Sequence, residues 1–192
     1  ELSLAEVVMV SSGSSALYLA TKLLDLPPGS EIVLPSFTWV ACASSVVLAG
    51  HKPVFADVDI RSMNVTAESI AKVITSKTSA IMVVDYAGLP VEIDSIRTFG
   101  LPIIEDAAHA VFSIRKGVPC GMLGDIGVYS FDSVKNLAVG EAGAVVTSSA
   151  ALADRARKFR YSCIGKSGFE SAASEVSQAR WWEYDVSDIE HK

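Results

Sequence analysis

The chain has 192 residues, half of them hydrophobic, which is enough to bury one substantial core. Its formal net charge is −6, and Lys and Arg do not cluster along it, which argues against a nucleic-acid-binding surface. No apolar run approaches the length of about 18 residues that a membrane-spanning helix needs. These totals favour a water-soluble protein that has neither a nucleic acid nor a membrane as its partner.

The N-terminus and the cysteines bear on the compartment. The first residues lack the basic start and the small-residue cleavage pattern of a signal peptide, so we expect a cytoplasmic protein. Cys42, Cys120 and Cys163 are odd in number and far apart, without the paired spacing of a zinc site or a disulfide framework. We therefore expect buried or free thiols and no metal site.

Short apolar runs alternate with stretches of helical character along most of the chain. This alternation is typical of βαβ crossovers, so the expected fold is α/β, with a mostly parallel central sheet and helices on both faces. Ligands of such sheets bind at the carboxyl ends of the strands. In chain order we expect strand 7–10, helix 15–26, strand 31–34, helix 39–49, strand 53–58, helix 67–74, strand 80–85, helix 93–99, strands 102–105, 124–130 and 144–147, and helix 151–161.

The composition changes near residue 165. The last stretch is polar but contains the adjacent Trp181 and Trp182, which need a partner surface or a continuation of the chain to cover them. We therefore divide the chain into a large domain, residues 1–164, and an extension, residues 165–192.

The first stretch with candidate chemistry, residues 11–16, follows an expected strand and opens an expected helix. N–H groups at a helix start are unpaired and the helix dipole is positive there, while Gly13 lets a ligand approach, so a phosphate would be held well. The alternative is that a serine at this position only caps the helix.

The second stretch, residues 103–109, is an apolar strand that ends in two carboxylates. Beside a protonated heterocyclic nitrogen, the Asp106 carboxylate would stay ionised and hold that proton in place. The alternative is that Glu105 and Asp106 cap a following helix, in which His109 would be a structural residue.

The third stretch, residues 128–136, places Lys135 between apolar strands with few other charges nearby. Partial burial favours the uncharged amine that acts as a nucleophile and forms a Schiff base. A lysine on a surface loop is the alternative.

The fourth stretch, residues 35–39, sets Trp39 just beyond a strand end. A flat indole there could lie over a flat cofactor ring, although a tryptophan in the core is the simpler interpretation.

Taken in order, these stretches resemble the DegT/DnrJ/StrS family of PLP-dependent sugar aminotransferases, which belongs to the aspartate-aminotransferase fold group. Six ordered motifs between about residues 7 and 162 carry the resemblance. They are SGSSAL at 12–17, PSFTWVA at 35–41, PVFADVD at 53–59, EDAAH at 105–109, SFDSVKN at 130–136 and GEAG at 140–143.

The resemblance implies pyridoxal 5′-phosphate as the cofactor and a catalytic pair. Lys135 resembles the lysine that carries the cofactor as a Schiff base and moves a proton during transamination. Asp106 resembles the partner of the pyridinium nitrogen. Family members that have His in place of this lysine act as dehydratases or deoxygenation enzymes, and Lys135 argues against that branch.

The resemblance also implies further cofactor-binding residues. Trp39 matches the aromatic residue that stacks on the ring, and His109 the residue near the phenolic oxygen. Gly13, Ser14 and Ser130 resemble the phosphate cradle.

Three positions depart from the family pattern. Ser14 replaces a threonine and keeps its hydroxyl. Ala142 replaces a glycine, which is tolerated if that position does not need a positive φ. Asp132 stands where many members have His, so the substrate contacts there stay open.

The function implied is transfer of an amino group from glutamate to a nucleotide-linked keto-sugar, by a homodimer whose sites are completed across the interface. Residues 181–186 resemble the segment before a stretch that reaches the partner subunit, so we expect a fragment without the small C-terminal domain and the usual N-terminal lead-in. Two alternatives are a PLP-binding regulatory protein without turnover and an α/β phosphate-binding domain unrelated to PLP.

Overall fold

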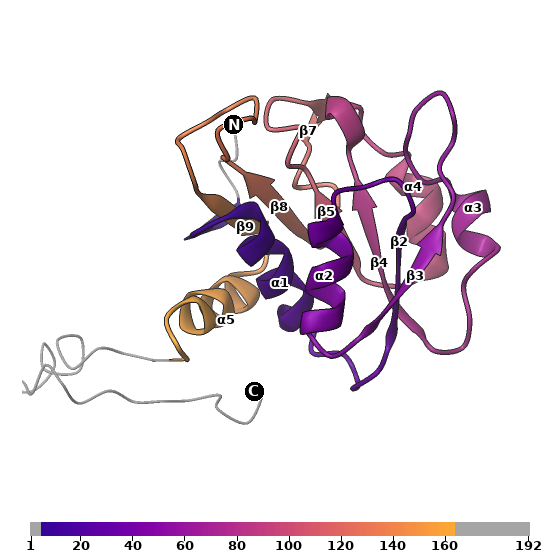
Figure 1. Cartoon of the computed structure of the whole chain (residues 1–192), viewed down its shortest axis with the longest axis horizontal. Helices are drawn as coiled ribbons and strands as arrows, with labels where there is room; N and C mark the ends of the chain where they lie inside the picture. Colours follow the sequence, from indigo (N-terminus) through magenta and orange to yellow (C-terminus); the bar gives the residue numbers. More distant parts are fainter. Residues whose placement is uncertain (1–4, 164–192) are drawn as a thin grey trace, which may run out of the picture.

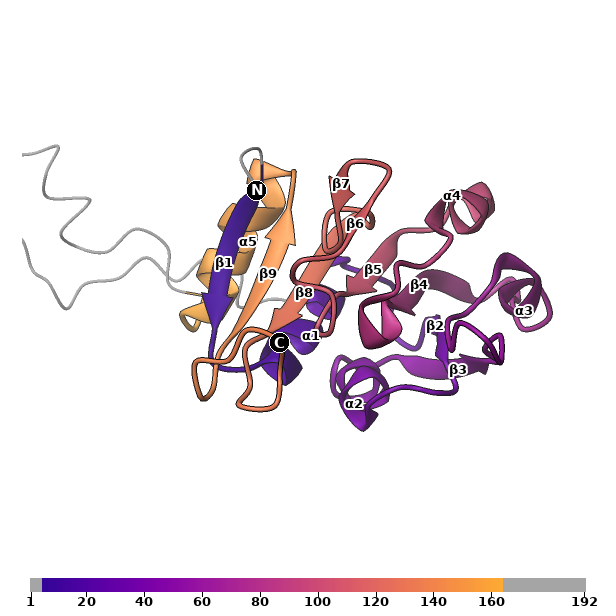
Figure 2. The ribbon, with the colours of Figure 1, turned by 90° about the horizontal axis from the view of Figure 1, so that it is seen from above.

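Seven strands form the central sheet of the protein, seen here in a computed structural model that describes residues 5–163. The strands are β1 (Glu6–Val10), β2 (Glu31–Pro35), β3 (Lys52–Ala56), β4 (Thr78–Val84), β5 (Ile103–Asp106), β8 (Ile126–Ser130) and β9 (Gly143–Thr147). Their spatial order is β1-β9-β8-β5-β4-β2-β3 (Figures 1 and 2). Within this sheet only β9 runs against the others, because it is antiparallel to both β1 and β8.

The sequences of the central strands are almost continuously apolar because both faces of the sheet are covered. In β4, Ala80 and Met82 belong to one buried cluster, whereas Ile81 and Val83 belong to the other. Successive side chains of a strand point to opposite faces, so a strand buried on both sides has no polar face. The expectation of a mostly parallel sheet with helices on both faces is confirmed.

The helices divide between the two faces. Residues of α1 (Gly13–Leu23), α2 (Val40–Leu48) and α5 (Ala150–Arg160) pack into one cluster, and Figure 1 shows these helices in front of the sheet. Residues of α3 (Ala67–Ala71) and α4 (Ile93–Ile96) pack into the other. Among residues 5–163, no helix combines the length and the apolar character needed to cross a bilayer.

The reversal of β9 brings one further loop to the edge of the sheet at which the parallel strands end. β1, β2, β4, β5 and β8 share a direction, so their carboxyl ends meet at the same edge. Gly143, the first residue of β9, pairs there with both Val10 and Ser130. The loop that enters β9 therefore lies beside the carboxyl ends of the parallel strands.

Several local expectations need correction. The structure contains a hairpin, β6 (Ile114–Arg115) and β7 (Val118–Pro119), that the sequence did not predict because its strands are only two residues long. The helix expected over 93–99 is divided into α4 and the 3₁₀ helix η2 (Arg97–Phe99). The helix expected over 67–74 is shorter, since α3 ends at Ala71.

The carboxyl end of β5 also differs from one interpretation of the sequence. Residues 107–112 form turns, so Asp106 and Glu105 cap no helix and His109 lies in none. A second 3₁₀ helix, η1 (Tyr86–Gly88), follows β4 at the same edge. All three cysteines are buried and free, as their spacing predicted.

The contact between β9 and the start of α1 tolerates no side chain at Gly143. A Cβ atom there would lie 2.3 Å from the Ser12 carbonyl oxygen and 2.7 Å from the Gly13 nitrogen. We predict that Gly143→Ala lowers the free energy of unfolding by about 1–3 kcal/mol, measured by urea denaturation, because backbone must move. Ser148→Ala, at an exposed position after β9, should leave it unchanged. Equal stability of Gly143→Ala and wild type would contradict the close packing.

Candidate active site

A pocket of about 220 Å³ opens at the carboxyl edge of the sheet. Its walls are residues at or just beyond the ends of β1, β2, β4, β5 and β8, together with the loop that enters β9. The seven residues singled out from the sequence all line it: Gly13, Ser14, Trp39, Asp106, His109, Ser130 and Lys135.

The start of α1 forms one wall of the pocket. Ser12 is its N-cap and accepts a hydrogen bond from the Ser15 N–H at 3.1 Å. The first N–H groups of a helix have no partner within the helix, so Gly13 and Ser14 present donors and a positive dipole end. A Cβ atom on Gly13 would lie 2.7 Å from the Ser130 Cβ, so glycine is what lets the helix start approach β8. The N–H groups at the start of α1 and the adjacent end of β8 can together hold an anion such as a phosphate.

Asp106, the last residue of β5, is a buried carboxylate with one donor on each oxygen. Its Oδ1 accepts from the Ala108 N–H at 3.0 Å, and its Oδ2 lies 3.2 Å from the Cys42 Sγ. Burial raises the pKa of Asp106 above its ordinary value, and these two hydrogen bonds and the charge of Lys135 offset this only in part. A cation bound in the pocket would therefore favour the ionised form.

Lys135 lies in the loop between β8 and β9 and is partly buried. Its backbone N–H donates to the Asp132 carbonyl at 2.9 Å, which makes a tight turn of residues 132–135. Next to it, Asn136 Nδ2 donates to the His109 carbonyl at 3.4 Å and joins the loop to the turn after β5. The amine of Lys135 thus shares a pocket with the Asp106 carboxylate, and they are close enough for the lysine charge to act on that acid.

His109 is half-buried, and its tautomer follows from its contacts. Nδ1 accepts from the Ala87 N–H at 3.3 Å, and the ring meets Tyr86 edge-on at 5.6 Å between centroids. Burial, and then the charge of Lys135, lowers the pKa of His109. The imidazole is therefore neutral at pH 7 and carries its proton on Nε2.

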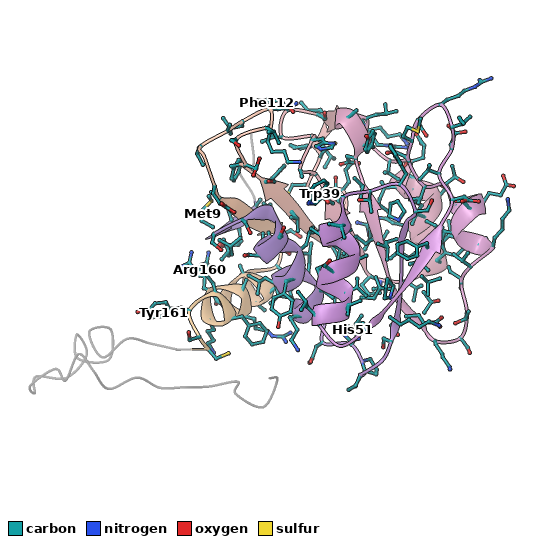
Figure 3. All side chains as sticks on the ribbon, viewed as in Figure 1. Met9, Trp39, His51, Phe112, Arg160 and Tyr161 are labelled. Carbon is teal, nitrogen blue, oxygen red and sulfur yellow. The ribbon has the colours of Figure 1, made fainter. Side chains whose placement is uncertain are left out.

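Trp39 is the residue just before α2, and its side chain is 74% exposed. The interpretation of Trp39 as a core residue is therefore wrong. Its indole lines the pocket at the edge where the parallel strands end (Figure 3). A large aromatic group in this position can cover a flat ligand.

The pocket also contains residues that the sequence did not single out. Thr38 follows β2 and Tyr86 follows β4, so a search of every strand end would have found both. Glu141 stands in the glycine-containing loop before β9. Ser12, the N-cap of α1, is a further lining residue. Cys42 could not have been found, because its contact with Asp106 joins residues 64 positions apart.

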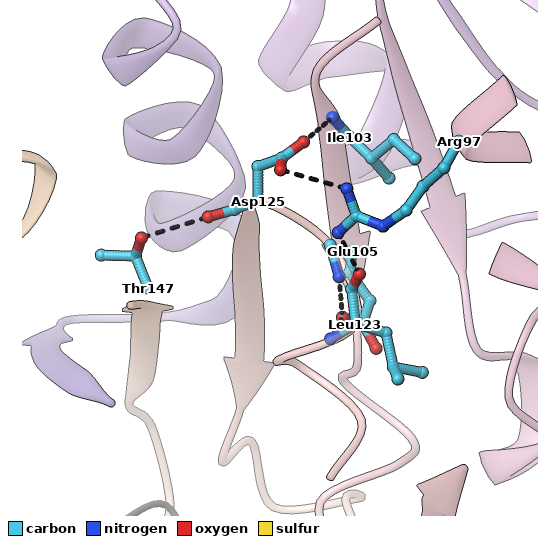
Figure 4. Close-up of polar contacts among 7 residues, drawn as sticks. Arg97, Ile103, Glu105, Leu123, Asp125 and Thr147 are labelled. Atoms are coloured by element: carbon cyan, nitrogen blue, oxygen red, sulfur yellow. Dashed lines mark hydrogen bonds and ion pairs between the residues drawn. The ribbon is translucent and has the colours of Figure 1, made fainter. Parts of the chain in front are cut away.

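Glu105 precedes Asp106 but serves the opposite face of the sheet. Its buried carboxylate accepts from the N–H groups of Gly121, Leu123 and Gly124 at 2.6–2.7 Å. Arg97, which donates to the Leu123 carbonyl and pairs with Asp125, braces the same loop (Figure 4). Glu105 therefore fixes the loop before β8 to the end of β5, a structural role in place of a cap.

Asp85 lies beside Glu105 and is fully buried. Oxygens of the two carboxylates and the Cys120 Sγ all lie within 4.8 Å of one another. Asp85 Oδ1 accepts from the Val91 N–H, but no donor reaches Oδ2. Burial, and then the charge of Glu105, raises the pKa of Asp85 to about 8. Two ionised carboxylates side by side would repel each other. A proton on Asp85 Oδ2 removes this repulsion, because the acid can then donate to Glu105, whose own oxygens already accept three N–H groups.

Comparison with known proteins identifies the family of the chain. The DegT/DnrJ/EryC1/StrS aminotransferase family matches residues 2–180, and the chain belongs to this family. It is 42% identical over 189 residues to a dTDP-4-dehydro-2,3,6-trideoxy-D-glucose 4-aminotransferase from Saccharopolyspora spinosa. That match covers 96% of this chain and 48% of the relative, so the chain spans about half of the relative's length.

Solved structures show the same architecture. An aminotransferase from Psychrobacter cryohalolentis superposes with a TM-score of 0.85 at 33% identity, over 95% of this chain and 46% of that one. NtdA from Bacillus subtilis, determined with the cofactor PMP bound, superposes with a TM-score of 0.77 at 26% identity, over 93% of this chain and 39% of that one.

The protonated state of Asp85 predicts a pH dependence of stability. In the unfolded chain Asp85 ionises near its ordinary pKa of 3.8, but in the folded protein it ionises only near 8. Its contribution to stability is therefore full below about pH 4 and falls by on the order of 1 kcal/mol per pH unit up to about pH 8. Asp85→Asn keeps a donor toward Glu105 but does not ionise. We predict that its free energy of unfolding rises progressively relative to that of wild type as the pH increases over this range.

Urea unfolding at pH 5, 6, 7 and 8 measures this difference. Asp57→Asn, at an exposed position after β3, is the matched control, and its difference from wild type should not vary with pH in the same way. Parallel stability curves for Asp85→Asn and wild type would show that Asp85 is ionised in the folded protein.

Proposed function

We propose that the protein is an aminotransferase that moves an amino group from glutamate to a nucleotide-linked keto-sugar, with pyridoxal 5′-phosphate as its cofactor. The observation that carries this proposal is the Lys135 amine and the Asp106 carboxylate in one pocket at the carboxyl edge of the sheet. Membership of the family and the identity to a dTDP-sugar aminotransferase support it. Because the chain covers 48% of that relative, the activity and the substrate are proposed for the whole protein.

The groups that line the pocket fit this cofactor chemically. The start of α1, with the hydroxyls of Ser14 and Ser130, suits a phosphate dianion. The buried Asp106 carboxylate suits a protonated ring nitrogen, and the Lys135 amine suits an aldehyde. The indole of Trp39 suits the face of a planar ring.

When bound, the cofactor supplies an electron sink for bond breaking at the carbon that carries the amino group. Lys135 would bind its aldehyde and transfer a proton between the substrate carbon and the cofactor carbon. Asp106 would hold the proton on the ring nitrogen. His109, neutral and with its proton on Nε2, would act as a hydrogen-bond donor to the phenolic oxygen.

A homodimer is the second part of the proposal. Large apolar side chains are exposed in the segments that follow β2, β5 and β8, and Figure 3 shows Trp39 and Phe112 at this edge of the molecule. Exposed apolar groups gathered around a site mark a contact surface, here for a second copy of the chain. These side chains are Trp39, Phe112, Val134, Leu137 and Val139.

Two predictions from the sequence complete the proposal. The large domain would cover residues 1–164, and the protein would be cytoplasmic. The expected extension, residues 165–192, and the contact proposed for Trp181 and Trp182 fall outside the described residues.

Sedimentation velocity tests the dimer. We predict a dimer for wild type and a lower dimer fraction for Val134→Glu, since the 83% exposed Val134 would place a carboxylate in the apolar contact. Leu48→Glu, at the far end of α2, should sediment as wild type. A wild-type protein that is monomeric at working concentration contradicts this part of the proposal.

Covalent binding of the cofactor tests the role of Lys135. After incubation with PLP and reduction by borohydride, the mass of wild type should increase by one reduced cofactor. Lys135→Ala should show no increase, because it lacks the amine that binds the aldehyde. Lys72→Ala, at the exposed residue that follows α3, should behave as wild type.

The remaining outcomes distinguish the alternatives. Lysine-dependent attachment followed by release of 2-oxoglutarate from glutamate supports the aminotransferase. Attachment without this half-reaction indicates a regulatory PLP-binding protein. Phosphate binding that is equal in Lys135→Ala and wild type, with no uptake of PLP, indicates a phosphate-binding domain unrelated to PLP.

A further inference from the structure

Cys42 is the third residue of α2 and is fully buried behind the pocket wall. Its Sγ lies 3.2 Å from Asp106 Oδ2 and 3.1 Å from Thr38 Oγ1. A buried thiol packed among apolar groups needs no polar partner, yet this one has two. One of them is the carboxylate on which the proposed chemistry depends.

The direction of these hydrogen bonds follows from the proton count. Burial, and then the charge of Asp106, raises the pKa of the Cys42 thiol, so the sulfur keeps its proton. With the proton on sulfur, the S–H group donates to Asp106 Oδ2. A thiol has a single proton, and the hydroxyl of Thr38 must therefore donate to the sulfur.

Asp106 is thus held from the protein side by two donors. The Ala108 N–H meets Oδ1 and the Cys42 thiol meets Oδ2, one on each oxygen. Each carboxylate oxygen accepts more than one hydrogen bond, so lone pairs remain for a ligand in the pocket. The groups that bear on Asp106 from the pocket side are Lys135 and His109.

We infer that Cys42 is a positioning residue for Asp106: its thiol, supported by Thr38, orients the carboxylate toward the ring nitrogen of the cofactor and favours its ionised form. This inference rests on the proposed function. The thiol is a weak donor, so it holds the carboxylate in place while leaving most of the negative charge available to the ring nitrogen.

A role in packing alone predicts a different order of variants. If Cys42 only fills space in the core, Cys42→Ala should be tolerated at least as well as Cys42→Ser, which buries a hydroxyl. If Cys42 positions Asp106, serine should restore function because it donates to the same oxygen, whereas alanine should not.

Infrared spectroscopy of the protein without cofactor tests the contact itself. The S–H stretching band that disappears in Cys42→Ser belongs to this thiol. In Asp106→Asn the same band should move to higher frequency, because an amide oxygen accepts more weakly than a carboxylate. The bands of Cys120 and Cys163 should not move. A Cys42 band that is unchanged in Asp106→Asn overturns the inference and leaves the proposed function untouched.

Steady-state kinetics with the cofactor-loaded protein tests the consequence. Cys42→Ala should lower kcat by roughly tenfold, as loss of a hydrogen bond to a charged group does, and move the acidic limb of the pH profile to higher pH. Cys42→Ser should recover most of kcat, and Cys163→Ala should match wild type. A wild-type profile for Cys42→Ala, or equal losses in the alanine and serine variants, overturns the inference. Absence of lysine-dependent cofactor binding in wild type overturns instead the proposed function.

Discussion

The buried carboxylate at the end of β5 is the group on which the pocket depends. Taking a negative charge out of water is costly, and here a backbone N–H, a thiol and the nearby Lys135 offset part of that cost. These partners come from the turn after β5, from α2 and from the loop after β8. The helices and strands must therefore keep their register for Asp106 to remain where it is, and the apolar packing on both faces of the sheet provides this.

Adjacent residues of β5 have separate tasks because a strand alternates its faces. Asp106 points into the pocket, whereas Glu105 fixes the loop of residues 121–124. Asp85 follows β4, lies on the same side of the sheet as the Glu105 carboxylate and keeps a proton beside it. One pair of neighbouring acids thus supplies both a group for ligand binding and the bracing of the strand that carries it.

Sequence reasoning succeeded where a local pattern sufficed. Alternating apolar runs identified the sheet, and the polar residues at strand ends identified the pocket lining, because parallel strands deliver their carboxyl ends to one edge. It failed for contacts without a local pattern. The donors to Glu105 lie 16 to 19 residues away, and Cys42 reaches Asp106 across 64. The hairpin of β6 and β7 was missed because such short strands leave no periodicity.

The loop that carries Lys135 returns to the point from which it starts. The Phe131 N–H donates to the Ala142 carbonyl at 2.8 Å, and the Val139 N–H donates to Phe131 at 3.0 Å, so the neck of the loop is closed by main-chain hydrogen bonds. The strand pairing is therefore independent of the number of residues in the loop. Insertions or deletions between the two ends would change the position of the amine over the pocket without breaking a strand pairing.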